Sequence, residues 1–77
     1  MEIKLFTQPY CTRCPQVKEA LKLAGLQWTE YNIETADGLA ELMMTGSELK
    51  ETPILVVDDE VIDGFDAQLS WIKQQKE

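Results

Sequence analysis

The only two cysteines of the chain, Cys11 and Cys14, lie at a predicted junction between a strand and a helix. Before them, residues 3–7 have the β-branched and aromatic content that is typical of a strand. After them, apolar side chains recur at the spacing of one helix face, at Val17, Ala20, Leu21 and Ala24. Two thiols at this spacing, one in the first helical turn and one just outside it, come close enough to form a disulfide. The junction therefore predicts a dithiol redox site.

The start of a helix changes the chemistry of a nearby sulfur. Unpaired N–H groups and the positive end of the helix dipole both favour a thiolate over a thiol. We therefore expect Cys11, the outer cysteine, to have a lowered pKa and to attack disulfides readily. Arg13 either adds positive charge beside it or is a solvent-exposed side chain. Because the chain has no histidine, a Cys-His or Ser-His nucleophile pair is excluded.

The composition limits the partners and the compartment. The 77 residues carry a net charge of −7, which argues against nucleic acid and anionic membranes as partners. The same charge either steers the protein toward basic proteins or only keeps it soluble. No apolar run is long enough for a membrane span, and the first residues lack the features of a signal peptide. We expect one domain over residues 1–77, monomeric and cytoplasmic, where a lone Cys-x-x-Cys motif indicates redox or metal chemistry rather than a structural bridge.

The remaining segments complete an α/β pattern. Strand-like composition marks residues 26–33, 54–57 and 60–63, the last two joined by a turn at residues 58–59. Helical spacing marks a segment from residue 37 to a stop at Gly46, and another from Phe65 to Ile72. The order β-α-β-α-β-β-α predicts a mixed four-stranded sheet covered by three helices.

Local signals predict how these helices begin and end. Gly25 is placed to end the first helix in the left-handed conformation. Thr35 or Asp37 is expected to cap the second helix, and Asp66 the third. Apolar side chains of the second and third helices are expected in the core, namely Met43, Met44, Phe65 and Leu69, and Leu39, Leu42 and Met43 are spaced for one face of the second helix.

Three motifs taken together resemble the glutaredoxin family of the thioredoxin fold over essentially the whole chain. They are Pro-Tyr-Cys-Thr-Arg-Cys at residues 9–14, Thr-Pro at residues 52–53, and Asp-Gly-Phe-Asp after the hairpin at residues 63–66. The resemblance implies that Cys11 is the nucleophile and Cys14 the resolving thiol. It also implies a cis peptide bond between Thr52 and Pro53, facing the disulfide, although a trans proline that simply opens a strand is the alternative.

The resemblance further implies a groove for glutathione or an extended peptide beside the cysteines. Gly64 and Asp66 would border it. The candidate substrate-binding residues are Gln8, Tyr10, Arg13, Lys50, Thr52, Pro53, Gly64, Phe65 and Asp66. Tyr10 either forms a wall of the groove or is a half-buried packing residue. For Asp66, capping of the third helix is the first expectation and contact with a ligand amine the second.

The chain departs from the usual glutaredoxin sequence at positions that bear on which reductant it uses. Ordinary glutaredoxins usually have Cys-Pro-Tyr-Cys, a lysine where this chain has Gln8, and paired glycines where it has only Gly64. Redoxins that donate electrons to ribonucleotide reductase are similar to this chain in length, in their non-Pro-Tyr dipeptide and in a Gly-Phe segment. The resemblance thus implies an oxidoreductase that reduces protein disulfides without a bound cofactor. Its reductant would be glutathione or thioredoxin reductase, and ribonucleotide reductase a possible partner.

A binding module is the alternative to an enzyme. Two cysteines without histidine cannot complete a four-ligand zinc site in one chain unless carboxylates contribute. A dimer could hold a metal ion or a [2Fe–2S] cluster through thiolates from both chains.

Overall fold

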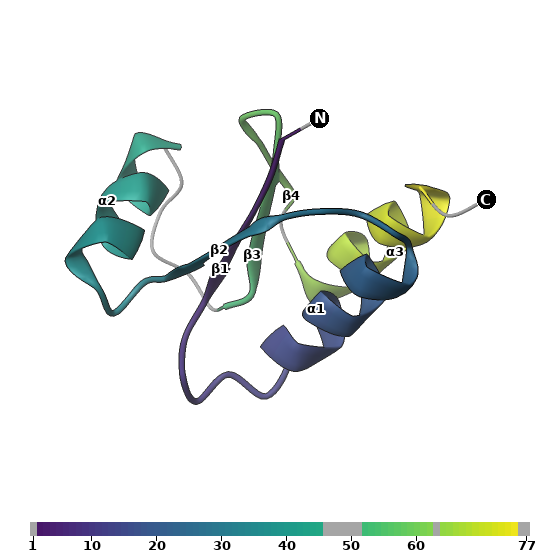
Figure 1. Cartoon of the computed structure of the whole chain (residues 1–77), viewed down its shortest axis with the longest axis horizontal. Helices are drawn as coiled ribbons and strands as arrows, with labels where there is room; N and C mark the ends of the chain where they lie inside the picture. Colours follow the sequence, from purple (N-terminus) through teal and green to yellow (C-terminus); the bar gives the residue numbers. More distant parts are fainter. Residues whose placement is uncertain (1, 46–51, 63, 76–77) are drawn as a thin grey trace.

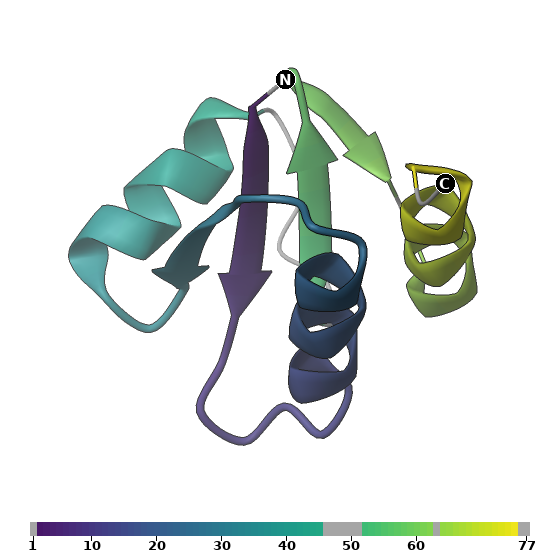
Figure 2. The same ribbon diagram turned by 45° about the vertical axis from the view of Figure 1, so that its right-hand side comes forward.

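Four strands form one mixed sheet in the order β2-β1-β3-β4 (Figure 2). The structure, a computed structural model, describes residues 2–45, 52–62 and 64–75. The strands are β1 (Ile3–Thr7), β2 (Thr29–Asn32), β3 (Ile54–Val57) and β4 (Glu60–Ile62). The central strand β1 pairs in parallel with β2 and antiparallel with β3, and β4 completes an antiparallel hairpin with β3.

Helices cover both faces of this sheet (Figure 1). They are α1 (Cys14–Leu23), α2 (Ala36–Met44) and α3 (Phe65–Gln75). The helices α1 and α3 lie against each other on one face, and α2 lies on the opposite face. The predicted element order and the mixed four-stranded sheet with three helices are therefore confirmed. No helix among the described residues has both the length and the apolar content that a bilayer crossing needs.

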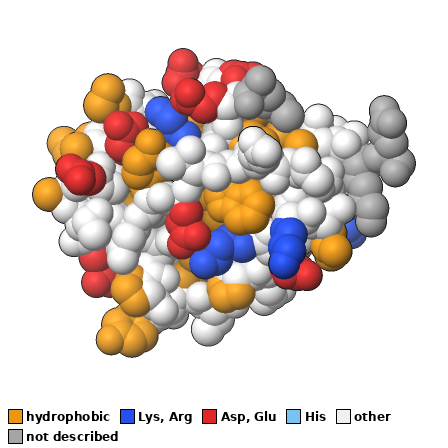
Figure 3. All heavy atoms as spheres, in the orientation of Figure 1, with side chains coloured by type: hydrophobic (Ala, Val, Ile, Leu, Met, Phe, Trp, Pro, Cys, Tyr) orange, Lys and Arg blue, Asp and Glu red, His pale blue; other side chains and the backbone are white. Residues whose placement is uncertain are grey.

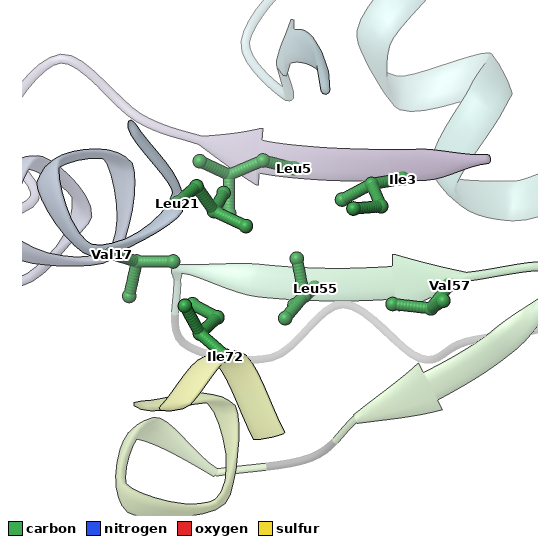
Figure 4. Close-up of a cluster of buried hydrophobic side chains, with 7 residues drawn as sticks. All are labelled: Ile3, Leu5, Val17, Leu21, Leu55, Val57 and Ile72. Atoms are coloured by element: carbon green, nitrogen blue, oxygen red, sulfur yellow. The ribbon is translucent and has the colours of Figure 1, made fainter. Parts of the chain in front are cut away.

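Two hydrophobic clusters hold the helices to the sheet. The larger one fills the space between the sheet and the α1–α3 pair, and Figure 4 shows its buried members, Ile3, Leu5, Val17, Leu21, Leu55, Val57 and Ile72. The smaller one lies under α2 and contains Phe6, Ile33, Leu42, Ile54 and Val56. Successive side chains of a strand point to opposite faces, so the unbroken apolar run of β3 serves both clusters.

The strand β2 is shorter than the predicted segment 26–33 because its first residues complete the preceding helix. Gly25 has φ +74° and ends α1 as expected. The N–H of Gly25 donates to the Lys22 carbonyl, and the N–H of Leu26 donates to the Leu21 carbonyl. A residue whose N–H closes a helix end is not free to begin a strand ladder, so pairing with β1 starts only at Thr29.

The predicted caps of α2 and α3, and the predicted ends of α2 and β4, differ in how they compare with the structure. Thr35 caps α2, since its Oγ1 accepts from the N–H of Gly38 at 2.9 Å. The prediction that Asp66 caps α3 is wrong: the helix begins at Phe65, so Asp66 lies inside the first turn, where its charge still complements the dipole. Gly46, the expected end of α2, and residue 63, the expected end of β4, lie outside the described residues.

The second helix packs through a narrower face than predicted. Gly38 and Leu42 are its buried residues, and a Cβ at Gly38 would clash with the Asn32 carbonyl. This close approach fixes the rotation of the helix, so Met43 and Met44 are 70% and 79% exposed, and Leu39 is also exposed. The prediction that Met43 and Met44 are core is wrong. Hydrophobic side chains are visible among acidic ones on the α2 side of Figure 3.

Candidate active site

Cys11 and Cys14 form a disulfide in the loop that leads from β1 into α1, at the bottom of Figures 1 and 2. Their Cα atoms are 5.5 Å apart. Cys14 is the first residue of α1 and is 2% exposed, whereas Cys11 lies in the loop and is partly exposed. Only one of the two sulfurs is therefore open to a large disulfide substrate.

The helix start points a hydrogen-bond donor at the exposed sulfur. The backbone N–H of Cys14 donates to Cys11 Sγ, with an N···S distance of 3.1 Å. Arg13 occupies the N-cap position without a side-chain cap, and no acidic residue lies in the first turn. Pro15 lies in that turn, as predicted, where a missing N–H costs little. An N–H donor and an uncompensated dipole end both favour negative charge on the Cys11 sulfur once the disulfide is reduced.

Arg13 connects the cysteine loop to the third helix. Its guanidinium carbon lies 5.2 Å from the centroid of the Phe65 ring, which is cation–π geometry. Phe65 itself packs against the larger hydrophobic cluster. The contact thus places both candidate residues beside the start of α1, where the helices α1 and α3 meet.

A surface cavity of about 340 Å³ brings several predicted residues to the exposed cysteine. Its lining consists of Gln8, Cys11, Thr12, Arg13 and Thr52. The hydroxyl of Thr52 donates to Gln8 Oε1 at 3.2 Å. This hydrogen bond joins two lining residues that are far apart in the sequence. The peptide bond between Thr52 and Pro53 is cis, as the family resemblance implied, and Pro53 is buried behind the cavity wall.

A second cavity, of about 300 Å³, touches both cysteines. Its lining consists of Thr7, Gln8, Pro9, Cys11, Cys14, Pro15, Lys18, Glu30 and Asn32. Within this lining, Glu30 Oε2 accepts from the Thr7 hydroxyl at 2.9 Å and lies 3.3 Å from Lys18 Nζ. Sequence analysis missed Lys18, on the first helix, and Glu30, which only the parallel pairing of β1 with β2 brings to the cysteine loop.

Three further candidates, Tyr10, Gly64 and Asp66, do not line either cavity. Tyr10 is 92% exposed, so the half-buried alternative for it is wrong. Gly64 is exposed and has φ +97°, and Asp66 is exposed in the first turn of α3. Lys50 lies outside the described residues.

A buried amide, also missed by sequence analysis, joins α3 to the residue before β3 and to the end of β4. Gln68 is 2% exposed, and its Nε2 donates to the carbonyls of Pro53 and Ile62. A signal for it existed, because residue 68 lies on the same helix face as Phe65 and Ile72, where a polar side chain is unusual.

Metal ligands are sparse around the disulfide. Across residues 2–45, 52–62 and 64–75, no three histidine, cysteine, aspartate or glutamate side chains gather as a metal site. A cluster held by this part of the chain would need thiolates from a second chain.

Comparison with known proteins identifies this arrangement. Residues 3–62 match the family model described as Glutaredoxin. An uncharacterised glutaredoxin-like 8.6 kDa protein of a rubredoxin operon in Clostridium pasteurianum is 29% identical over 63 residues, which are 82% of this chain and 84% of that protein.

Solved structures agree on the fold. The crystal structure of the thioredoxin-like protein BC3987 has a TM-score of 0.78 and 30% identity, covering 96% of this chain and 99% of that one. NrdH-redoxin from Escherichia coli, a glutaredoxin-like protein, has a TM-score of 0.74 and 22% identity, covering 96% of this chain and 93% of that one. The thioredoxin fold is therefore confirmed, with a redox-active cysteine pair of the kind that thiol–disulfide redoxins use.

Proposed function

Because the chain belongs to the glutaredoxin family, we propose that it reduces protein disulfides, with Cys11 as the nucleophile and Cys14 as the resolving thiol. The observation that carries this assignment is the N–H of Cys14, 3.1 Å from the sulfur of Cys11. The exposed sulfur has a donor that stabilises its thiolate, and the buried sulfur lies within bonding distance.

The reaction proceeds in two exchanges. The Cys11 thiolate attacks a substrate disulfide, so that a bond forms between the two sulfurs while the substrate S–S bond breaks and the leaving thiolate takes a proton from water. Cys14 then loses its proton to water and attacks Cys11 Sγ, which releases the second substrate thiol. Two electrons pass to the substrate, and the protein is left in its disulfide form.

The reductant that best fits the groove is a flavoprotein of the thioredoxin reductase type. Gln8 stands where ordinary glutaredoxins usually have a lysine, and Gly64 stands where paired glycines are usual. NrdH-redoxin, which shares the fold, is described as having a thioredoxin-like activity profile. Ribonucleotide reductase is the candidate protein substrate, and the cytoplasm the expected compartment.

A comparison of donors tests this proposal. Oxidised protein is mixed with NADPH and thioredoxin reductase, or with NADPH, glutathione and glutathione reductase, and the reduction of a protein disulfide is followed by NADPH consumption. We expect faster turnover with thioredoxin reductase and none from Cys11→Ser with either donor. Rapid reduction by glutathione would reject thioredoxin reductase as the preferred donor. If the protein disulfide is reduced with neither donor, the proposed function is rejected.

A further inference from the structure

Gln68 connects three elements through one buried amide group. Its Nε2 donates to the Pro53 carbonyl at 2.7 Å and to the Ile62 carbonyl at 3.2 Å. Pro53 directly precedes β3, and Ile62 is the last residue of β4. The side chain comes from α3, so the NH₂ group uses both of its hydrogens to hold two strand ends to one helix.

One atom of this amide is left without a partner. The Oε1 of Gln68 is buried and has no donor among the described residues. A buried polar atom without a partner is unfavourable, but an apolar side chain at this position would instead take the donor away from the Pro53 and Ile62 carbonyls. The amide is therefore better explained by the two carbonyls that it positions than by core packing.

One of the two carbonyls belongs to the residue that follows a wall residue of the cavity beside Cys11. Pro53 follows Thr52, whose side chain lines the cavity with Cys11 and bonds to Gln8. Ile62 is the last residue of β4, so its carbonyl ties the hairpin of β3 and β4 to α3. The cavity wall at Thr52 is thus held, through the adjacent backbone at Pro53, by the side chain of Gln68.

We propose that Gln68 is a positioning residue for peptide substrates. By fixing the backbone at Pro53 and Ile62, it holds the Thr52 wall in place for an extended peptide that pairs with that backbone while its disulfide meets Cys11. The inference rests on the proposed reduction of protein disulfides and adds the residue that orders the peptide groove. A small disulfide that contacts only the sulfur does not depend on Gln68.

Two probes with the same leaving group separate these cases. One is a short linear peptide whose cysteine is disulfide-bonded to thionitrobenzoate, and the other is free cysteine bonded to the same group. Attack by Cys11 releases coloured thionitrobenzoate from either probe, so stopped-flow absorbance of the reduced protein gives the rate and the half-saturating concentration. The variant is Gln68→Met, which keeps the length and removes the donors. The control is Gln74→Met, at an exposed position of the same helix.

We expect Gln68→Met to raise the half-saturating peptide concentration at least about fivefold, as for the loss of an ordering hydrogen bond. Its rate with the cysteine probe should match the wild type, and Gln74→Met should leave both probes unchanged. An unchanged peptide concentration for Gln68→Met, or an equal loss with both probes, would overturn the inference while the proposed function stands. If the wild type releases no thionitrobenzoate from the peptide probe, the proposed function and the inference both fail, whereas release without saturation overturns the inference alone.

A measurement without any change at residue 68 covers the case in which Gln68→Met does not fold. In Cys14→Ser, Cys11 is trapped as a mixed disulfide with either the peptide or cysteine, and the side-chain amide signals of Gln68 are compared by NMR. We expect these signals to shift in the peptide adduct relative to the cysteine adduct. Identical signals in the two adducts would refute a positioning role.

Discussion

The backbone N of Cys14 lies 3.1 Å from Cys11 Sγ. Cys14 is itself buried, and its N–H donates a hydrogen bond to the sulfur of Cys11. The two cysteines therefore have different environments within one short loop. In the reduced protein this difference separates their acidities, because a hydrogen bond favours a thiolate and burial disfavours one. The first two predictions follow from this relationship.

We predict that the pKa of Cys11 in the reduced protein lies below that of a free cysteine and that the pKa of Cys14 lies above it. Thiolate absorbance in the ultraviolet, recorded against pH for Cys14→Ser and for Cys11→Ser, measures each sulfur alone. Equal titration curves for the two variants would contradict the assignment of roles.

Replacing each cysteine should stop the reaction at a different stage. Cys11→Ser should reduce turnover to the background level, since the exposed nucleophile is lost. Cys14→Ser should still attack a substrate disulfide but remain attached to it, and mass spectrometry of the products would detect the adduct. Full activity in Cys11→Ser, or an adduct on Cys14 in that variant, would reverse the roles.

Gly38→Ala should destabilise the fold by about 1–3 kcal/mol, because the added methyl group enters the space of the Asn32 carbonyl. Urea unfolding measures the loss. Gly25→Ala is the matched control: its Cβ would have no neighbour within 4 Å, so only the positive φ opposes it. If the two variants lose the same free energy, the close approach of α2 to β2 is not what excludes a side chain at residue 38.

Adjacent residues of α2 should respond in opposite ways to truncation. Leu42→Ala should cost about 2–5 kcal/mol, since Leu42 is 1% exposed in the smaller hydrophobic cluster. Met43→Ala should change the unfolding free energy by less than about 0.5 kcal/mol, as is usual for an exposed position. Comparable losses in both variants would mean that Met43 is core, as its spacing predicted.

The freshly purified protein should be a colourless monomer if the cysteines act as an enzyme. Visible absorbance and the mass measured by light scattering test this together. A coloured dimer that loses its colour when iron is removed would instead favour cluster binding through thiolates of two chains.

Local chemistry predicted most of the fold. A strand composition, a Cys-x-x-Cys motif, a proline in the first turn and Gly25 each act over a few residues, so the cysteine loop and α1 could be predicted without long-range information. The Thr52-Pro53 isomer came from a family resemblance rather than from the residues themselves, and Lys50 of the predicted groove lies outside the described residues.

What could not be predicted depends on how the elements approach one another. Spacing alone put Met43 in the core, but the contact between Gly38 and β2 turns it outward. Glu30 reaches the cysteine loop only through parallel pairing of β2, and Gln68 gains its role only when α3 meets the ends of two strands. Each depends on contacts between segments that are distant in the sequence.

The unequal exposure of Cys11 and Cys14 also determines where a small thiol forms a non-specific mixed disulfide with the protein. Any such adduct forms on Cys11, the more accessible sulfur, and Cys14 lies within bonding distance of it. Cys14 can attack the Cys11 sulfur of this mixed disulfide and release the small thiol without another molecule. The modified protein therefore returns to its Cys11–Cys14 disulfide form.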